Sequence, residues 1–162
     1  MHRFLMSVLA LVAPAISQAQ QSATVRVYGQ PNFTTGSVNH GGTVDAASHD
    51  YPLGISVDSE GGVYVADRNN HRVLYFANDG NAVADRVYGQ RGSFTAHIAN
   101  NDGGGNSGAP SPDDLSSPTG VALSSRGGIF VNDRDNHRIL HFPRGATAAD
   151  RIYGQFGGSR ST

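Results

Sequence analysis

The feature that most constrains the fold of this chain is an internal repeat. Residues 52–76 return as residues 118–142, 66 positions later, with glycine, apolar and charged residues in the same order. A second signature, Tyr-Gly-Gln, ends three segments at Gln30, Gln90 and Gln155. Self-similarity at a fixed spacing indicates supersecondary units that share a core with their neighbours. We therefore expect repeated modules rather than one continuous globular pattern.

Each unit predicts four short β-strands. In the first copy we expect them at residues 54–58, 63–66, 72–76 and 86–89, separated by Gly-Gly, Asn-Asn and Asn-Asp-Gly turns. Apolar residues fall on both alternations of these strands, so both faces of each sheet must be covered. Four-stranded sheets stacked radially, as in a β-propeller, meet this requirement.

The predicted fold class is therefore all-β. We expect two propeller blades, each of four antiparallel strands, and one extra strand around residues 26–29. No segment shows a helical periodicity. Because a closed propeller needs about four to eight blades, two blades and one strand predict an incomplete propeller.

The repeat resembles a known family. Pro-x-Gly, then Gly-Gly followed by an apolar strand, then Asp-Arg-x-Asn-His-Arg occur in this order within residues 52–90 and 118–155. This order is similar to the NHL repeat, and residues 28–36 are similar to loops of exported bacterial NHL-repeat proteins. The resemblance implies β-propeller blades, commonly six in a ring. It implies no particular activity, because folds of this kind host many functions.

Composition excludes several classes of function. The formal net charge is −1, all 12 basic residues are arginines, and no run of like charge occurs. A nucleic-acid binder would need a basic patch, so we expect no nucleic-acid partner. The absence of cysteine excludes disulfides, thiolate metal sites and cysteine nucleophiles.

Residues 1–19 predict a secretory signal peptide. A positive start precedes a nearly apolar stretch at residues 4–16, and Ser17 and Ala19 are small residues where signal peptidase cleaves. This stretch falls short of the roughly 20 residues that span a bilayer, so we expect no membrane span and a secreted or periplasmic mature protein. The remaining predicted regions are an N-terminal strand and long loop at 20–51, blade 1 at 52–90, an inter-blade loop at 91–117, blade 2 at 118–155 and a tail at 156–162.

Two blades leave the outer apolar faces of both sheets without a partner, and three explanations stay open. The chain is a fragment of a longer propeller, or three copies close a six-bladed ring head to tail, or the chain completes another protein. The predicted partners are thus further blades or further copies, in addition to a ligand.

The loop-rich end of the blades is the predicted site. The turn between the second and third strands lies at the same end as the long loops 31–51 and 91–117, which exceed ordinary connections in length. Within the second loop, residues 100–108 predict disorder. The candidate ligand-binding residues are Arg68, Asn70, His71, Arg134, Asn136 and His137.

Two interpretations of this end remain. Asp, Asn and Arg in a repeated turn serve the scaffold by capping amides and pairing charges. For function, we expect a non-enzymatic binding or scaffolding module for a protein, peptide or glycan, without cofactor or metal. The alternative is a fragment of an exported propeller enzyme, a metal-dependent lyase or hydrolase similar to peptide-amidating lyases, in which His71 and His137 would converge on a metal.

Overall fold

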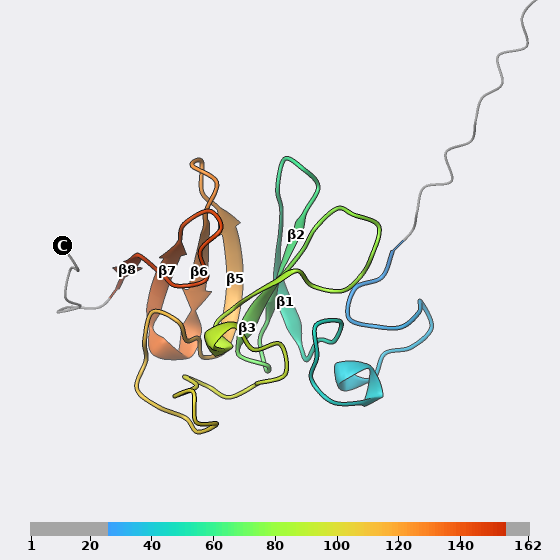
Figure 1. The fold of residues 1–162 in the computed structure, drawn as a ribbon, viewed down its shortest axis with the longest axis horizontal. Coiled ribbons are helices and arrows are strands. Elements are labelled where there is room, and N and C mark those ends of the chain that lie inside the picture. Colours follow the sequence, from blue (N-terminus) through green and yellow to red (C-terminus); the bar gives the residue numbers. More distant parts are fainter. Residues whose placement is uncertain (1–25, 155–162) are drawn as a thin grey trace, which may run out of the picture.

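A computed structural model describes residues 26–154 of the chain; the predicted signal peptide at 1–19 and the tail at 156–162 lie outside them. The described residues form two four-stranded antiparallel sheets that stand side by side (Figure 1). The strands are β1 (Pro52–Val57), β2 (Val63–Asp67), β3 (Arg72–Phe76), β4 (Arg86–Tyr88), β5 (Pro118–Leu123), β6 (Ile129–Asp133), β7 (Arg138–Phe142) and β8 (Arg151–Tyr153).

Each sheet is a meander in which strands that follow one another in sequence are paired in space. The order is β1-β2-β3-β4 in blade 1 and β5-β6-β7-β8 in blade 2. Short 3-10 turns at η1 (Val38–Gly41), η2 (Gln90–Gly92) and η3 (Arg134–Asn136) are the helical elements of the described part. The prediction of an all-β chain with two four-stranded blades is confirmed.

The two sheets pack on each other through opposite faces of the repeat. We call the face of a sheet that points along the chain toward the next blade its forward face, and the opposite one its backward face. The forward face of blade 1 and the backward face of blade 2 form one core cluster together with Leu115. Its buried members from the sheets are Tyr64, Ala66, Val73, Tyr88, Ile129, Val131, Leu140 and Phe142.

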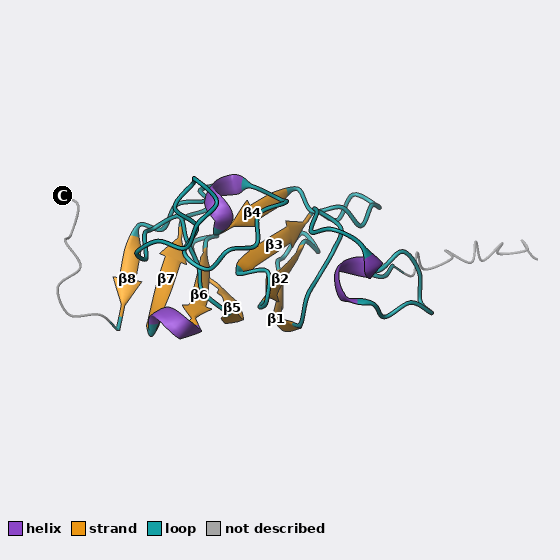
Figure 2. Cartoon of the chain, turned by 90° about the horizontal axis from the view of Figure 1, so that it is seen from below, coloured by secondary structure: helices purple, strands orange, loops and turns teal. Residues whose placement is uncertain are grey.

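The innermost strands β1 and β5 touch, and a glycine permits the contact. A Cβ atom on Gly54 would lie 2.7 Å from the Cα of Gly120 and 2.8 Å from the carbonyl oxygen of Thr119. Both neighbours are backbone, so any side chain at Gly54 would push the strands apart. Figure 2 shows the strands of the two sheets fanning out from this inner contact.

The backward face of blade 1 is covered by loop rather than by a sheet. Its buried residues include Leu74, Phe76 and Val87, and Tyr28 and Ala46 of the segment before β1 pack on them. This segment runs along the side of blade 1 that faces away from blade 2 (Figure 1).

The extra strand expected at residues 26–29 does not form. Tyr28 instead packs on Phe76 with ring centroids 4.7 Å apart, much as Tyr88 of β4 packs on Phe142 at 5.2 Å. The tyrosine therefore takes the position of a fourth-strand tyrosine. Residues 26–29 pair with neither sheet of the described part, and a strand needs such pairing for its backbone N–H and C=O groups.

Candidate functional site

The polar turns between the second and third strands are built around a buried aspartate. In blade 1, one carboxylate oxygen of Asp67 accepts from the backbone N–H of Asp50 at 2.7 Å. The other accepts from Nδ2 of Asn70 and from Nε of Arg72, both at 2.8 Å. Asp67 and Arg72 are fully buried, so their charged groups are not hydrated. The hydrogen bonds within the protein replace the lost hydration.

The guanidinium of Arg72 ties the loop before β1 to the sheet. Its Nη2 donates to the carbonyl oxygens of Asp45 and Ser48, at 2.9 and 2.8 Å. Its Nη1 donates to the carbonyl oxygen of Phe94, at 2.5 Å. One side chain thus fixes both the loop that precedes blade 1 in the sequence and the loop that follows it.

Blade 2 repeats the same network. Asp133 accepts from the backbone N–H of Ser116 at 2.6 Å, from Nδ2 of Asn136 at 2.8 Å and from Nε of Arg138 at 2.6 Å. Arg138 in turn donates to the carbonyl oxygen of Asp114 at 3.1 Å. The recurrence explains the repeated Asp, Asn and Arg of the motif as scaffold.

The histidine of each turn adopts an unusual backbone conformation, and in blade 1 its side chain also links the two blades. His71 and His137 both adopt the left-handed conformation, with φ of 52°; it is the histidine, and not the preceding asparagine, that takes the positive φ. Nδ1 of His71 accepts from the backbone N–H of Ser117 at 3.0 Å, which joins blade 1 to the start of blade 2. Burial lowers the pKa of His71, so its ring is held in the neutral, accepting form.

The two arginines among the candidate residues, Arg68 and Arg134, lie closer to solvent than the scaffold arginines. The guanidinium of Arg68 lies 5.5 Å from the ring centre of Tyr51 and donates to Asn69. Arg134 is exposed and pairs with the neighbouring Asp135 at 3.1 Å. Of the six candidate ligand-binding residues, Asn70 is buried in the scaffold, whereas these two arginines remain open to contact.

The inter-blade loop is tied down by the Tyr-Gly-Gln signature. The side-chain amide of Gln90 donates to the carbonyl oxygens of His71 and Ile98, at 3.0 and 2.7 Å, and accepts from the N–H of Ile98. Within this loop the structure folds residues 100–108, for which the composition predicts disorder, into a turn closed by a bridge between Asn101 and Ser107.

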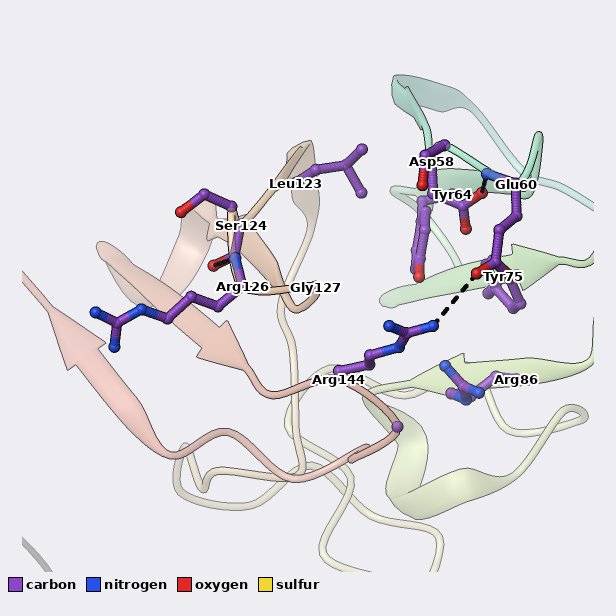
Figure 3. A pocket seen from close by; sticks show the side chains of 13 residues that line it. Asp58, Glu60, Tyr64, Tyr75, Arg86, Leu123, Ser124, Arg126, Gly127 and Arg144 are labelled. Carbon is purple, nitrogen blue, oxygen red and sulfur yellow. Dashed lines mark hydrogen bonds and ion pairs between the residues drawn. The ribbon is translucent and has the colours of Figure 1, made fainter.

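A pocket of about 620 Å³ opens between the blades at the opposite end, beyond the polar turns. It lies between the β1–β2 turn and the β2, β3 and β4 side chains of blade 1 on one side and the β5–β6 and β7–β8 connections of blade 2 on the other (Figure 3). Its charged and aromatic lining residues are Asp58, Glu60, Tyr64, Tyr75, Arg86, Arg126 and Arg144. Figure 3 shows Arg144 reaching across toward blade 1, whereas Arg126 points away from the cavity.

The blade 1 wall is a stack of aromatic and charged groups. The rings of Tyr64 and Tyr75 lie 4.6 Å apart, and the guanidinium of Arg86 lies 5.2 Å from the ring centre of Tyr75. Burial raises the pKa of both phenols, with a further contribution at Tyr75 from the charge of Asp58. Both phenols are therefore neutral hydrogen-bond donors at any physiological pH.

A glycine makes this wall possible. A Cβ on Gly62 would lie 2.5 Å from the hydroxyl of Tyr75 and 2.7 Å from Oδ2 of Asp58. Across the pocket, Nη2 of Arg144 pairs with Oε1 of Glu60 at 3.3 Å, and both side chains are largely exposed. The pocket thus combines a fixed aromatic wall with an ion pair that water can reach.

The sequence analysis did not predict these pocket residues. The sequence does contain one indication of them, since the two copies of the repeat differ here: Asp58 and Tyr75 of the first copy are Ser124 and His141 in the second. Within residues 26–154, the wall that combines these residues and faces the other blade is therefore that of blade 1.

Residues 26–154 contain neither a cluster of metal ligands nor a membrane-spanning helix. No group of three or more His, Cys, Asp or Glu side chains in this part could hold a metal ion together. Nor does this part contain a helix long and apolar enough to cross a membrane.

Two antiparallel four-stranded sheets, stacked forward face on backward face, define an all-β repeat protein with propeller-type blades. A family model described as NHL repeat matches residues 50–76 and 115–142, so the chain carries two NHL repeats. Among solved structures, the chain is similar to one titled "Streptogramin B lyase structure", with 15% sequence identity and a TM-score of 0.41. The similarity covers 65% of this chain and 26% of that one. No curated protein matches the sequence.

Proposed function

We propose that this protein is a non-enzymatic binding module whose protein or peptide ligand enters the pocket between the two blades. The observation that supports this most is the composition of the pocket. It offers neutral phenols, two carboxylates and the guanidiniums of Arg86 and Arg144, all at strand ends or tight turns. A site on rigid elements holds a ligand with less ordering cost than a site on loops.

A peptide fits this chemistry better than a neutral sugar. The ion pair between Arg144 and Glu60 is exposed, and each member can exchange its partner for a charged group of a ligand. Arg86 is held over Tyr75 and donates to the hydroxyl of Tyr88 at 3.2 Å, so its remaining donors have a fixed direction toward a carboxylate. Peptides supply carboxylates, ammonium groups and backbone carbonyls together.

The loop-rich end is the second place where a ligand could dock. There Arg134 is exposed and Arg68 is half-buried, whereas Asn70 and Asn136 are engaged in the scaffold. The pocket is preferred because its charged groups lie around one hollow, whereas these two arginines belong to separate turns.

The test is peptide selection followed by calorimetry with matched variants. Peptides selected on the purified protein should bind at least 10-fold more weakly to Arg86→Gln and Arg144→Gln. The control is Arg151→Gln, because Arg151 is the counterpart of Arg86 in blade 2 but lies on the face that points away from the pocket. Binding that survives both pocket variants but is lost in Arg68→Ala or Arg134→Ala would move the site to the polar turns. Selection of glycans but not peptides would contradict the ligand class.

We also propose that the protein acts outside the cytoplasm, on the strength of the signal-like residues 1–19. Mass spectrometry of the protein recovered from a periplasmic or culture fraction should find an N-terminus at Gln20. A chain that retains Met1 and stays in the cytoplasmic fraction would contradict export.

A further inference from the structure

We infer that the pocket between the blades recognises a carboxylate group of its ligand, held by the hydroxyl of Tyr64 and the guanidinium of Arg86. The inference rests on the proposed function, because it takes this pocket as the ligand site. It adds the chemical group that is recognised and names Tyr64 as a residue that selects for it. In a peptide, such a group is either the C-terminal carboxylate or the side chain of an aspartate or glutamate.

The carboxylates of the pocket already have partners. Oδ1 of Asp58 accepts from the backbone N–H groups of Glu60 and Gly62, at 3.0 and 2.8 Å. Oε1 of Glu60 pairs with Nη2 of Arg144 at 3.3 Å. A cationic group of a ligand would therefore have to compete with contacts that the protein makes by itself.

The guanidinium of Arg86, by contrast, has no carboxylate partner. None of the ion pairs among the described residues involves it. Its Nη1 donates to the hydroxyl of Tyr88 at 3.2 Å, which uses one of the five N–H donors of a guanidinium. The equivalent Arg151 in blade 2 lies 3.8 Å from Asp150. A positive charge without an internal counter-charge is thus a feature of the blade 1 wall.

The hydroxyl of Tyr64 is a second donor without a partner. The side chain is 7% exposed, and its ring is fixed between those of Tyr75 and Tyr88, at 4.6 and 6.2 Å. The hydroxyl forms no hydrogen bond with any described residue, although Tyr64 lines the pocket. Figure 3 shows the ring directed toward the side of the pocket where Arg144 lies. Because burial raises the pKa of this phenol, it stays a neutral donor.

This hydroxyl is not required by the fold of a blade. Phe130 takes the equivalent place in blade 2, since it pairs with His141 as Tyr64 pairs with Tyr75. The two copies of the strand therefore differ here by one oxygen atom on the ring, and the copy that carries the oxygen lines the pocket. The variant Tyr64→Phe should accordingly remove the donor and keep the packing.

Unpaired donors in a partly buried site require an acceptor from the ligand. A carboxylate only accepts hydrogen bonds and carries a full negative charge, so it satisfies the phenol and the guanidinium together. The guanidinium of Arg144 lines the same hollow and adds a second positive charge. A backbone carbonyl or a primary amide lacks the charge and binds a guanidinium more weakly. The surplus of donors thus favours an acidic group over a neutral or cationic one.

The experiment is an NMR titration of the purified protein with matched small probes. The first pair is N-acetyl-diglycine as the free acid and as its carboxamide, which imitate a peptide C-terminus with and without its charge. The second pair is N-acetyl-aspartate methylamide and the asparagine analogue, which place the same difference on a side chain. In at least one pair, the acid should shift the amide signals of residues 58–64 and of Arg86, whereas its amide should not. The pair that responds identifies the source of the carboxylate.

Variants test the two donors. The affinity for the responding acid should fall about 10-fold or more in Tyr64→Phe and in Arg86→Gln, because each loses a hydrogen bond to a charged group. Tyr153→Phe and Arg151→Gln are the matched controls and should bind as the wild type does, since neither residue lines the pocket. An unchanged affinity in both Tyr64→Phe and Arg86→Gln would overturn the inference, as would an equal response to the acid and the amide in both pairs.

The same probes separate this inference from the proposed function. Selected peptides that depend on Arg144 but bind equally well with an amidated C-terminus and with neutral side chains would overturn the carboxylate site and leave the peptide-binding function intact. Binding of the acid probes to a protein on which no peptide can be selected would support the carboxylate site and contradict the peptide ligand. A lack of response to all four probes would overturn the inference whatever the peptides do.

Discussion

The fourth-strand tyrosines Tyr88 and Tyr153 occupy equivalent positions on the forward faces of the two blades, yet only one of them is covered in the described part of the chain. Tyr88 of blade 1 is 2% exposed and Tyr153 of blade 2 is 43% exposed. The difference does not come from the sequence of the repeat, since both are tyrosines preceded by an apolar residue and an arginine. In the described residues a second sheet packs on the forward face of blade 1, and that contact covers Tyr88. Burial in a repeat protein is a property of neighbours as much as of the repeat itself.

The largest loss of stability is expected on replacing the buried arginine that both blades share, Arg72 in blade 1 and Arg138 in blade 2. Arg72→Ala would leave the buried carboxylate of Asp67 without its charge partner, and breaking a buried pair typically lowers the free energy of unfolding by about 3–5 kcal/mol. Arg138→Ala should lower it by a smaller amount, because Arg72 also binds the carbonyl oxygen of Phe94 in the loop beyond blade 1. Urea unfolding of both variants measures the difference. Equal losses would show that the Phe94 bond contributes nothing.

Replacing the fourth-strand tyrosines separates the covered face from the open one. Tyr88→Ala removes a ring that packs against Phe142 in the core, which should lower the free energy of unfolding by about 3 kcal/mol or more. Tyr153→Ala removes a half-exposed ring and should change it by less than about 1 kcal/mol in the monomer. Thermal and urea unfolding at low protein concentration are the measurements. A large loss for Tyr153→Ala there would mean that its face is covered after all.

The glycines of the inner strands, Gly54 and Gly120, allow the covered and the open forward face to be compared by adding a single methyl group. Gly54→Ala forces a methyl group against the backbone of β5 and should lower the free energy of unfolding by about 1–3 kcal/mol. A Cβ at Gly120 meets only the Cβ of Asn132, at an ordinary contact distance of 3.7 Å, so Gly120→Ala should be within about 0.5 kcal/mol of the wild type. Circular dichroism melts of both proteins measure this, and equal effects would contradict the close approach of β1 and β5.

The smallest effect concerns the link between the blades at His71. Its pKa in the folded protein lies below the unfolded value of 6.5, so the unfolded chain binds the proton more readily. Stability from this group is fully present above about pH 6.5 and is lost as the pH falls toward the folded pKa. His71→Asn keeps a residue that tolerates the left-handed conformation and removes the titration. The wild type should therefore lose more stability than the variant between pH 7 and pH 5 in urea titrations. Parallel pH profiles would show that His71 does not titrate on unfolding.

Much of the fold was predictable because the repeat occurs twice in one chain. Strand number, turn positions and the antiparallel meander follow from local alternation and turn residues, which need no knowledge of the partner sheet. The strand expected at residues 26–29 was wrong for the opposite reason. Arg-Val-Tyr has the pattern of a fourth strand, but a strand needs a neighbour for its backbone, and none is present in the described part.

The candidate site was predictable in part. The polar turns could be located from the motif, and the suspicion that Asp, Asn and Arg serve the scaffold agrees with their bonds. The pocket could not be found in this way. Asp58 and Tyr75 belong to blade 1 and Arg144 belongs to blade 2, so only the packing of one blade on the other brings Arg144 to the same hollow.

The sequence by itself determined two NHL-type blades, their strand order and the residues that cap their turns, because these depend on short-range periodicity and on a motif that repeats. Only the tertiary structure decided which apolar face is buried, where the pocket lies and which faces stay open. Those outcomes depend on contacts between sheets, and a contact exists only when both surfaces are present and meet in the right orientation.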